Sequence, residues 1–311
     1  MNIIFRAYFI SAALVAFILG GSFLFFHSAS AVDTAATSVT VANATPTVTS
    51  VTLNGGSAIS LTENTTTSVA ITATITDTNN CDDVFTSGTI TAVIYRSGVT
   101  ASSGCSNDAR NCYPSITMVE VGNSCNGSTD TSGDAVATSG VWYFADATDT
   151  SSTYPGQVWI VAVTATDGSS ASASSTASVE LNSLYALEMT GALTYGSLAA
   201  GASSTADSVA TSTNTGNFKI DNEISGTDMT AGGFTLVATE QRYGTSTAAH
   251  PDLTFQLTTT ATARSINVPV AVTSTNPTST VATFWRINIP NGSRTGSYTG
   301  TNTFTAIYSA D

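Results

Sequence analysis

Apolar and polar residues alternate along most of the chain after residue 44, with the period of two that is typical of β-strands. In SVAITATIT (68–76), apolar residues occupy every second position. The stretch QVWIVAVTATD (157–167) is apolar on both faces, as a strand buried between two layers would be. No stretch after residue 31 shows a convincing helical period of 3.6 residues. The pattern therefore predicts an all-β fold.

The strand patterns divide into two groups that meet near residues 181–185. Short strands with polar turns between them favour two tandem immunoglobulin-like β-sandwich domains, over residues 32–182 and 183–311. The first group comprises residues 45–53, 68–76, 89–96, 115–121, 141–145, 157–167 and 176–182. The second comprises residues 184–190, 192–198, 207–213, 217–224, 234–242, 253–260, 265–272, 282–290 and 297–308. Asn291-Gly292 supplies turn chemistry, so the last two strands are expected to form a hairpin.

Residues 1–31 read as a targeting segment rather than as part of the fold. Arg6 precedes an uncharged apolar run, and Ala29-Ser30-Ala31 fits the small-residue rule for signal-peptide cleavage. The other interpretation is a retained anchor, because about twenty uncharged residues can span a bilayer. We expect a cleaved signal peptide and a secreted or cell-surface protein, with membrane contact only if residues 1–31 stay attached.

The cysteines indicate two disulfides, because an even number in an exported chain is typical of such bridges. Residues 97–139 form a long polar insertion with only one short strand candidate, residues 115–121, and a loop of that length needs to be tied down. Cys81 ends the second strand and is expected to anchor this insertion. All three pairings remain open among Cys81, Cys105, Cys112 and Cys125.

The stretch TDTNNCDDV (76–84) concentrates carboxylates and amides directly after a strand. Calcium binds six to eight oxygen ligands, mostly carboxylates and carbonyls. The second and sixth strands run the same way in a seven-stranded sandwich, so their ends can meet. A calcium site is one hypothesis, and turn formation by Asp and Asn side chains is the other. The candidate ligands are Asp77, Asn79, Asp82, Asp83 and Asp167, whereas Asp146 follows an oppositely directed strand and fits less well.

The charge and the histidine content of the chain argue against two classes of function, nucleic-acid binding and histidine-dependent catalysis. The net charge is −13, but only 9% of residues are charged. A net-acidic chain lacks the basic face that nucleic-acid binding requires. His250 is the only histidine outside the targeting segment, so histidine-dependent catalysis has almost no basis and we expect a non-enzymatic protein.

Three adjacent aromatic residues form a second candidate site. Trp142, Tyr143 and Phe144 must place rings on both faces of their strand, so one side is a candidate contact patch for a ligand or glycan. Trp159 and Trp285 are interpreted as core residues.

The motifs INIPNGSRTGSYTGTNTFTA, LTYGSLAAGASS and NTGNFKIDNEISGTDM resemble the closing and opening strands of exported bacterial β-sandwich domains. TITDTNNCDDV, VWYFADATDT and VWIVAVTATDGSS resemble modules in exported surface proteins of uncultivated small-genome bacteria, and more distantly PKD- or cadherin-like modules. The resemblance covers most of residues 40–311 and implies tandem Ig-like domains without implying an activity.

Together these observations predict a secreted or cell-surface structural or adhesive protein, such as a surface-layer or appendage component. Its expected partner is another copy of itself, or a host-cell or glycan surface. One alternative is a ligand- or glycan-binding module that uses the 97–139 insertion and the aromatic strand. Another is a secreted carboxylate-dependent hydrolase.

Overall fold

The computed structural model describes residues 34–99, 105, 108–127, 129–271 and 279–310. The expected signal peptide at residues 1–31 lies outside the described residues. A compact unit begins at Asn43, and residues 34–46 have no regular secondary structure. Among the described residues, no helix has the length and apolar character needed to cross a membrane.

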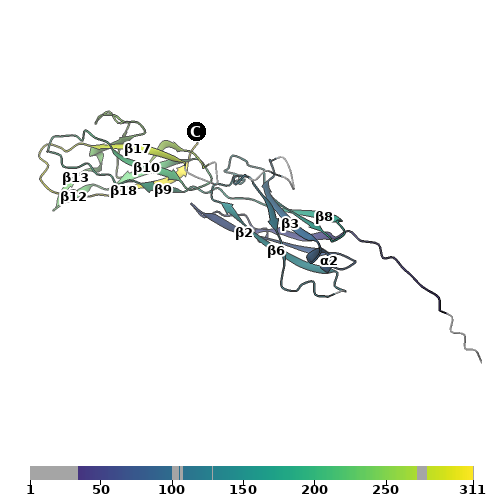
Figure 1. Cartoon of the computed structure of the whole chain (residues 1–311). Coiled ribbons are helices and arrows are strands. Elements are labelled where there is room, and N and C mark those ends of the chain that lie inside the picture. The colour runs from purple at the N-terminus through teal and green to yellow at the C-terminus, as the bar shows by residue number, and fades with distance from the viewer. Residues whose placement is uncertain (1–33, 100–104, 106–107, 128, 272–278, 311) are drawn as a thin grey trace, which may run out of the picture. The chain divides into compact units, whose positions relative to one another are not determined.

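The fold is all-β, as predicted (Figure 1). Residues 43–182, called here the N-terminal half, contain two antiparallel four-stranded sheets with the orders β1-β2-β6-β5 and β4-β3-β7-β8. The strands are β1 (Thr47–Leu53), β2 (Thr66–Thr76), β3 (Thr89–Arg96), β4 (Cys112–Thr117), β5 (Val119–Glu120), β6 (Ser132–Trp142), β7 (Trp159–Thr166) and β8 (Ser172–Val179). A 3₁₀ turn, η1 (Asn54–Gly56), follows β1, and the short helix α2 (Asp82–Phe85) connects β2 to β3.

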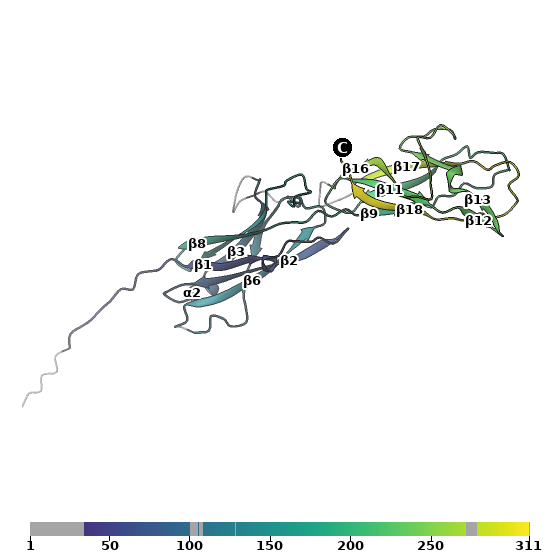
Figure 2. The same cartoon turned by 180° about the vertical axis from the view of Figure 1, so that it is seen from behind.

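The two sheets pack face to face around one apolar core, which makes the N-terminal half a β-sandwich. Alternation in β2 sends Val69, Ile71 and Ile75 into this core with no exposed surface. Trp159 of β7 enters it from the other sheet and is also fully buried. Figure 2 shows β1, β2 and β6 side by side, with α2 at one end of the strands.

Strand β6 corrects the prediction for this region. Residues 132–139, expected to lie in the polar insertion and outside any strand, form most of an 11-residue strand. The expected strand at 141–145 is only its last part, since β6 ends at Trp142. The pattern was hidden because small residues face the core: Gly133 and Ala135 are buried. A Cβ at Gly133 would lie 2.6 Å from the Phe85 ring, so this position needs glycine.

The described residues between 183 and 310, called here the C-terminal half, form three further antiparallel sheets. Their orders are β15-β14-β17-β10-β9, β16-β11-β18 and β12-β13. The strands are β9 (Leu187–Thr190), β10 (Ser208–Asn214), β11 (Ile220–Gly226), β12 (Met229–Ala231), β13 (Phe234–Leu236), β14 (Gln241–Gly244), β15 (Phe255–Gln256), β16 (Thr262–Val268), β17 (Thr280–Ile287) and β18 (Asn302–Tyr308), with a 3₁₀ turn η2 (Ala238–Glu240). Trp285 is fully buried and stacks on Tyr243, with ring centroids 4.3 Å apart.

Two expectations for this half are wrong. β17 and β18 do not form a hairpin, because β17 pairs with β10 and β14 whereas β18 pairs with β11 in another sheet. The connection over residues 288–301 is long enough to cross between sheets despite its Asn-Gly turn. Residues 192–198 form no strand, and β12 was not expected at all.

Candidate metal centre

Three carboxylates converge at one end of the N-terminal half. Asp77 follows β2 directly, Asp167 follows β7 directly, and Asp83 lies in α2. One carboxylate oxygen from each lies within 4.8 Å of the other two. The prediction that the ends of these two strands meet is therefore confirmed.

Asp77 is the least compensated member of this group. Its side chain is buried, with only 1% of the residue exposed. Oδ1 accepts a hydrogen bond from the backbone N–H of Asn79 at 2.8 Å, whereas Oδ2 is buried with no hydrogen-bond partner. Burial of a charged oxygen without a partner is unfavourable, and such a group calls for a bound water or ion. The structure thus places an orphaned carboxylate oxygen beside two other carboxylates.

Three hydrogen bonds donated to the Asp167 carboxylate stabilise its ionised form. Oδ2 accepts a hydrogen bond from Asn43 Nδ2 at 2.8 Å, and Oδ1 accepts bonds from the N–H groups of Ser169 and Ala171 at 2.9 and 2.8 Å. The Asn43 bond is the main reason that the pKa of Asp167 lies below its usual value. The carboxylate is therefore charged at neutral pH and able to bind a cation.

The approach of Asp83 depends on a glycine. A Cβ at Gly168 would lie 2.6 Å from Asp83 Oδ1 and 2.9 Å from the Ser87 side chain. Because glycine leaves this space open, α2 can bring its carboxylate against the turn that follows β7.

The other two predicted ligands have different roles. Asn79 Oδ1 accepts a hydrogen bond from the N–H of Ala44, next to the cluster. Asp82 is outside the group of three, and its Oδ1 accepts the hydroxyl of Thr86. Sequence reasoning missed Asn43 as part of this site. Since β1 pairs antiparallel with β2 and Thr47 lies opposite Thr76, the residues before β1 must reach the end of β2.

The donor set is chemically specific. Carboxylate and amide oxygens suit hard cations such as calcium, and zinc sites rely on cysteine or histidine instead. All four cysteines are in disulfides. Asp77, Asp83 and Asp167 would be the anionic ligands of a calcium ion here.

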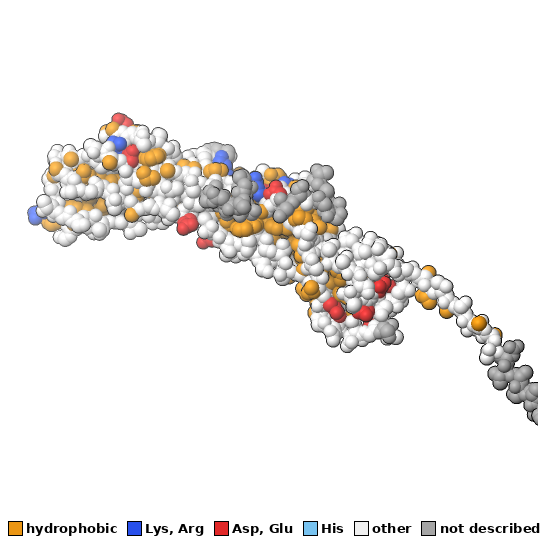
Figure 3. Space-filling view, in the orientation of Figure 1, with side chains coloured by type: hydrophobic (Ala, Val, Ile, Leu, Met, Phe, Trp, Pro, Cys, Tyr) orange, Lys and Arg blue, Asp and Glu red, His pale blue; other side chains and the backbone are white. Residues whose placement is uncertain are grey.

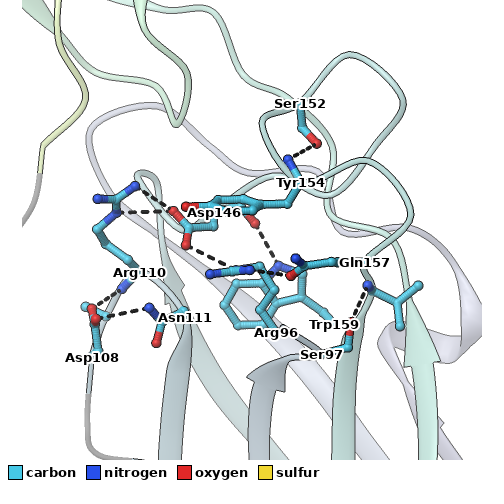
Figure 4. Close-up of polar contacts among 12 residues, drawn as sticks. Arg96, Ser97, Asp108, Arg110, Asn111, Asp146, Ser152, Tyr154, Gln157 and Trp159 are labelled. Carbon is cyan, nitrogen blue, oxygen red and sulfur yellow. Dashed lines mark hydrogen bonds and ion pairs between the residues drawn. The ribbon is translucent and has the colours of Figure 1, made fainter. Parts of the chain in front are cut away.

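Asp146 belongs to a separate buried ion network (Figure 4). Arg96 Nε lies 3.2 Å from Asp146 Oδ2, and Arg110 Nη2 lies 2.7 Å from Oδ1. The Arg96 guanidinium also donates to Gln157 Oε1 and lies 3.7 Å from the centroid of the Tyr154 ring. Burial raises the pKa of Asp146, and the two guanidinium groups oppose that rise. Both carboxylate oxygens of Asp146 are thus paired with arginines, and Asp146 is not part of the carboxylate cluster.

The disulfides join Cys81 to Cys125 and Cys105 to Cys112. Cys81 therefore anchors the insertion, as predicted. Arg110 belongs to the same insertion, so the ion network fastens its first part while Cys125 fastens its second. Two disulfides are typical of a non-cytoplasmic protein.

The aromatic candidate site is not an exposed patch. Tyr143 and Phe144 are buried, with 1% and 0% of their surfaces exposed, and their rings pack edge to face at 5.1 Å. Trp142 is half-buried and stacks on Phe144 at 5.6 Å. The prediction of an open platform here is wrong because Tyr143 and Phe144 are covered in a small apolar cluster with Ala271, separate from the core of the sandwich.

No protein-family model matches the chain, and no curated protein sequence is significantly similar to it.

Proposed function

We propose that this chain is a secreted or cell-surface structural or adhesive protein without catalytic activity. The supporting observation is how the 97–139 insertion is fastened. The Cys81–Cys125 bridge and the ion pairs of Arg96 and Arg110 with Asp146 fasten this segment to the sandwich, and the Cys105–Cys112 bridge closes a short loop within it. Charged side chains are sparse on the face shown in Figure 3, which suits contact with uncharged polymers or other copies. The expected partners are further copies of the chain or a glycan surface.

Two measurements test this proposal: the location of the protein in the cell and the oxidation state of its cysteines. Immunogold labelling of intact expressing cells should place the chain outside the cytoplasm. Alkylation without prior reduction should leave all four cysteines unmodified in mass spectrometry, because both bridges are formed. Four alkylated thiols in a cytoplasmic fraction would overturn the proposal. Electron microscopy of the same material should then show lattices or filaments if the partner is another copy.

We further propose that the carboxylate cluster binds calcium and stabilises the N-terminal half. The orphaned Oδ2 of Asp77 carries this proposal, because a cation would supply the partner that the protein does not. Calcium at about one hundred times its dissociation constant should stabilise the native state by about 2.7 kcal/mol. Melting should therefore occur several degrees higher in calcium than in EGTA.

Matched variants make the melting test specific. Asp77→Asn should abolish the difference between calcium and EGTA, since it removes the buried anionic ligand. Asp82→Asn should retain the difference, because Asp82 lies in the same short helix but outside the cluster. Identical melting curves for the wild-type chain in calcium and EGTA would refute the calcium site.

A further inference from the structure

The chain segment that enters the N-terminal half is attached directly to the carboxylate cluster. Asn43 Nδ2 donates to Asp167 Oδ2 at 2.8 Å. The next residue, Ala44, donates its backbone N–H to Asn79 Oδ1, and the N–H of Asn79 donates to Asp77 Oδ1 at 2.8 Å. Two consecutive residues of the entering segment therefore contact both strand ends that supply the cluster.

These contacts mark the point where the compact unit begins. The unit starts at Asn43, whereas strand pairing starts four residues later, with Thr47 opposite Thr76. In residues 34–42, which have no regular secondary structure, Val39 and Val41 are 88% and 77% exposed. The first turn of chain that the fold holds, residues 43–46, thus depends on the cluster as well as on the burial of Pro46.

Without a cation, this attachment is weak. Asn43 is exposed, so water competes for its hydrogen bond and reduces the net contribution of that bond. Three carboxylates within 4.8 Å also repel one another, which favours outward movement of Asp83 and of the turns that carry the other two. A bound divalent cation would remove the repulsion and hold the strand ends together.

We infer that the cluster is a calcium-dependent anchor for the N-terminal segment, with Asn43 as the residue that connects the two; this inference rests on the proposed calcium site. The Asn43 amide now points its nitrogen at the Asp167 carboxylate, as expected toward a negative charge. A cation neutralises that charge and attracts oxygen instead, so rotation of the amide would present Oδ1 as a neutral ligand. Calcium would then fix the chain from Asn43 onward, and its removal would leave the chain fixed only from Thr47.

The hydrogen-exchange rate of the Ala44 backbone N–H measures whether residues 43–46 are held in place. Hydrogen exchange of this amide is measured in the purified exported chain with saturating calcium chloride and with EGTA, and calcium affinity is measured by titration calorimetry. We expect exchange at Ala44 to be at least tenfold slower in calcium. In Asn43→Ala, calcium binding should weaken several-fold and the exchange ratio should fall to about one. Asn291→Ala, an asparagine substitution in the C-terminal half, should behave as the wild type.

The outcomes separate the two proposals. If calorimetry shows calcium binding but Ala44 exchanges equally fast in calcium and EGTA, the anchor is overturned and the calcium site stands. The anchor is also overturned if Asn43→Ala keeps the tenfold protection. If the wild-type chain binds no calcium, both the calcium site and the anchor are refuted.

Discussion

Replacing Asp146 with alanine is expected to destabilise the N-terminal half by about 3–5 kcal/mol, because it leaves a buried guanidinium without its counter-ion. The side chains of Arg96 and Asp146 are only 8% and 4% exposed. After the substitution, Arg96 would keep Gln157 and the Tyr154 ring as neighbours, and neither carries a negative charge. Equilibrium urea unfolding gives the free-energy difference, and hydrogen exchange of peptides from β3 and β7 assigns it to this half.

A double variant distinguishes a lost ion pair from lost packing. Arg96→Met combined with Asp146→Leu removes both buried charges and keeps similar volume, so it should cost much less than Asp146→Ala. Arg110→Ala should also cost less, because the Arg110 side chain is 32% exposed and solvent screens its charge. A double variant as unstable as Asp146→Ala would contradict the electrostatic explanation.

Removing the Cys81–Cys125 bridge with two serine substitutions is expected to cost about 4 kcal/mol, since it frees a long loop in the unfolded chain. The sequence separation of the bridged residues is 44. The free energy of unfolding from urea titration measures the loss.

The second bridge is the matched control. Cys105 and Cys112 are separated by 7 residues, so their double serine variant should lose only about 2 kcal/mol by the same loop-closure relation. Equal losses for the two bridges would show that loop entropy does not govern their contributions.

Two strand patterns predicted both the all-β fold and the carboxylate cluster. They are the clean alternation of β2 and the long apolar run of β7. An aspartate directly follows each of these strands, so the shared direction of the strands was enough to predict that Asp77 and Asp167 lie close together. The third carboxylate of the cluster could not be predicted from the sequence. The turn of α2 directs Asp83 toward the cluster and leaves Asp82 exposed. Both residues have the same chemistry, and only the backbone path separates their roles.

Other features were hidden for specific physical reasons. The core-facing residues in the first part of β6, Gly133 and Ala135, are small and carry no strand signal of their own. The Arg96–Asp146–Arg110 network joins residues that are 50 and 36 positions apart in sequence, and no local pattern links them. Asn43 lies in a polar stretch before the first strand, and only the pairing of β1 with β2 explains its position beside Asp167.

The pairing of β2 with β6 has a consequence for how the chain folds. The paired residues range from Thr76 with Ser132 to Thr66 with Trp142, so every contact in this ladder closes a loop of more than fifty residues. Proteins dominated by such distant contacts fold slowly. For the exported chain proposed above, slow folding would keep the chain unfolded while it passes through a narrow export channel. Oxidation of Cys81 and Cys125 closes most of the same loop in advance, so the oxidised chain should fold faster than the reduced chain.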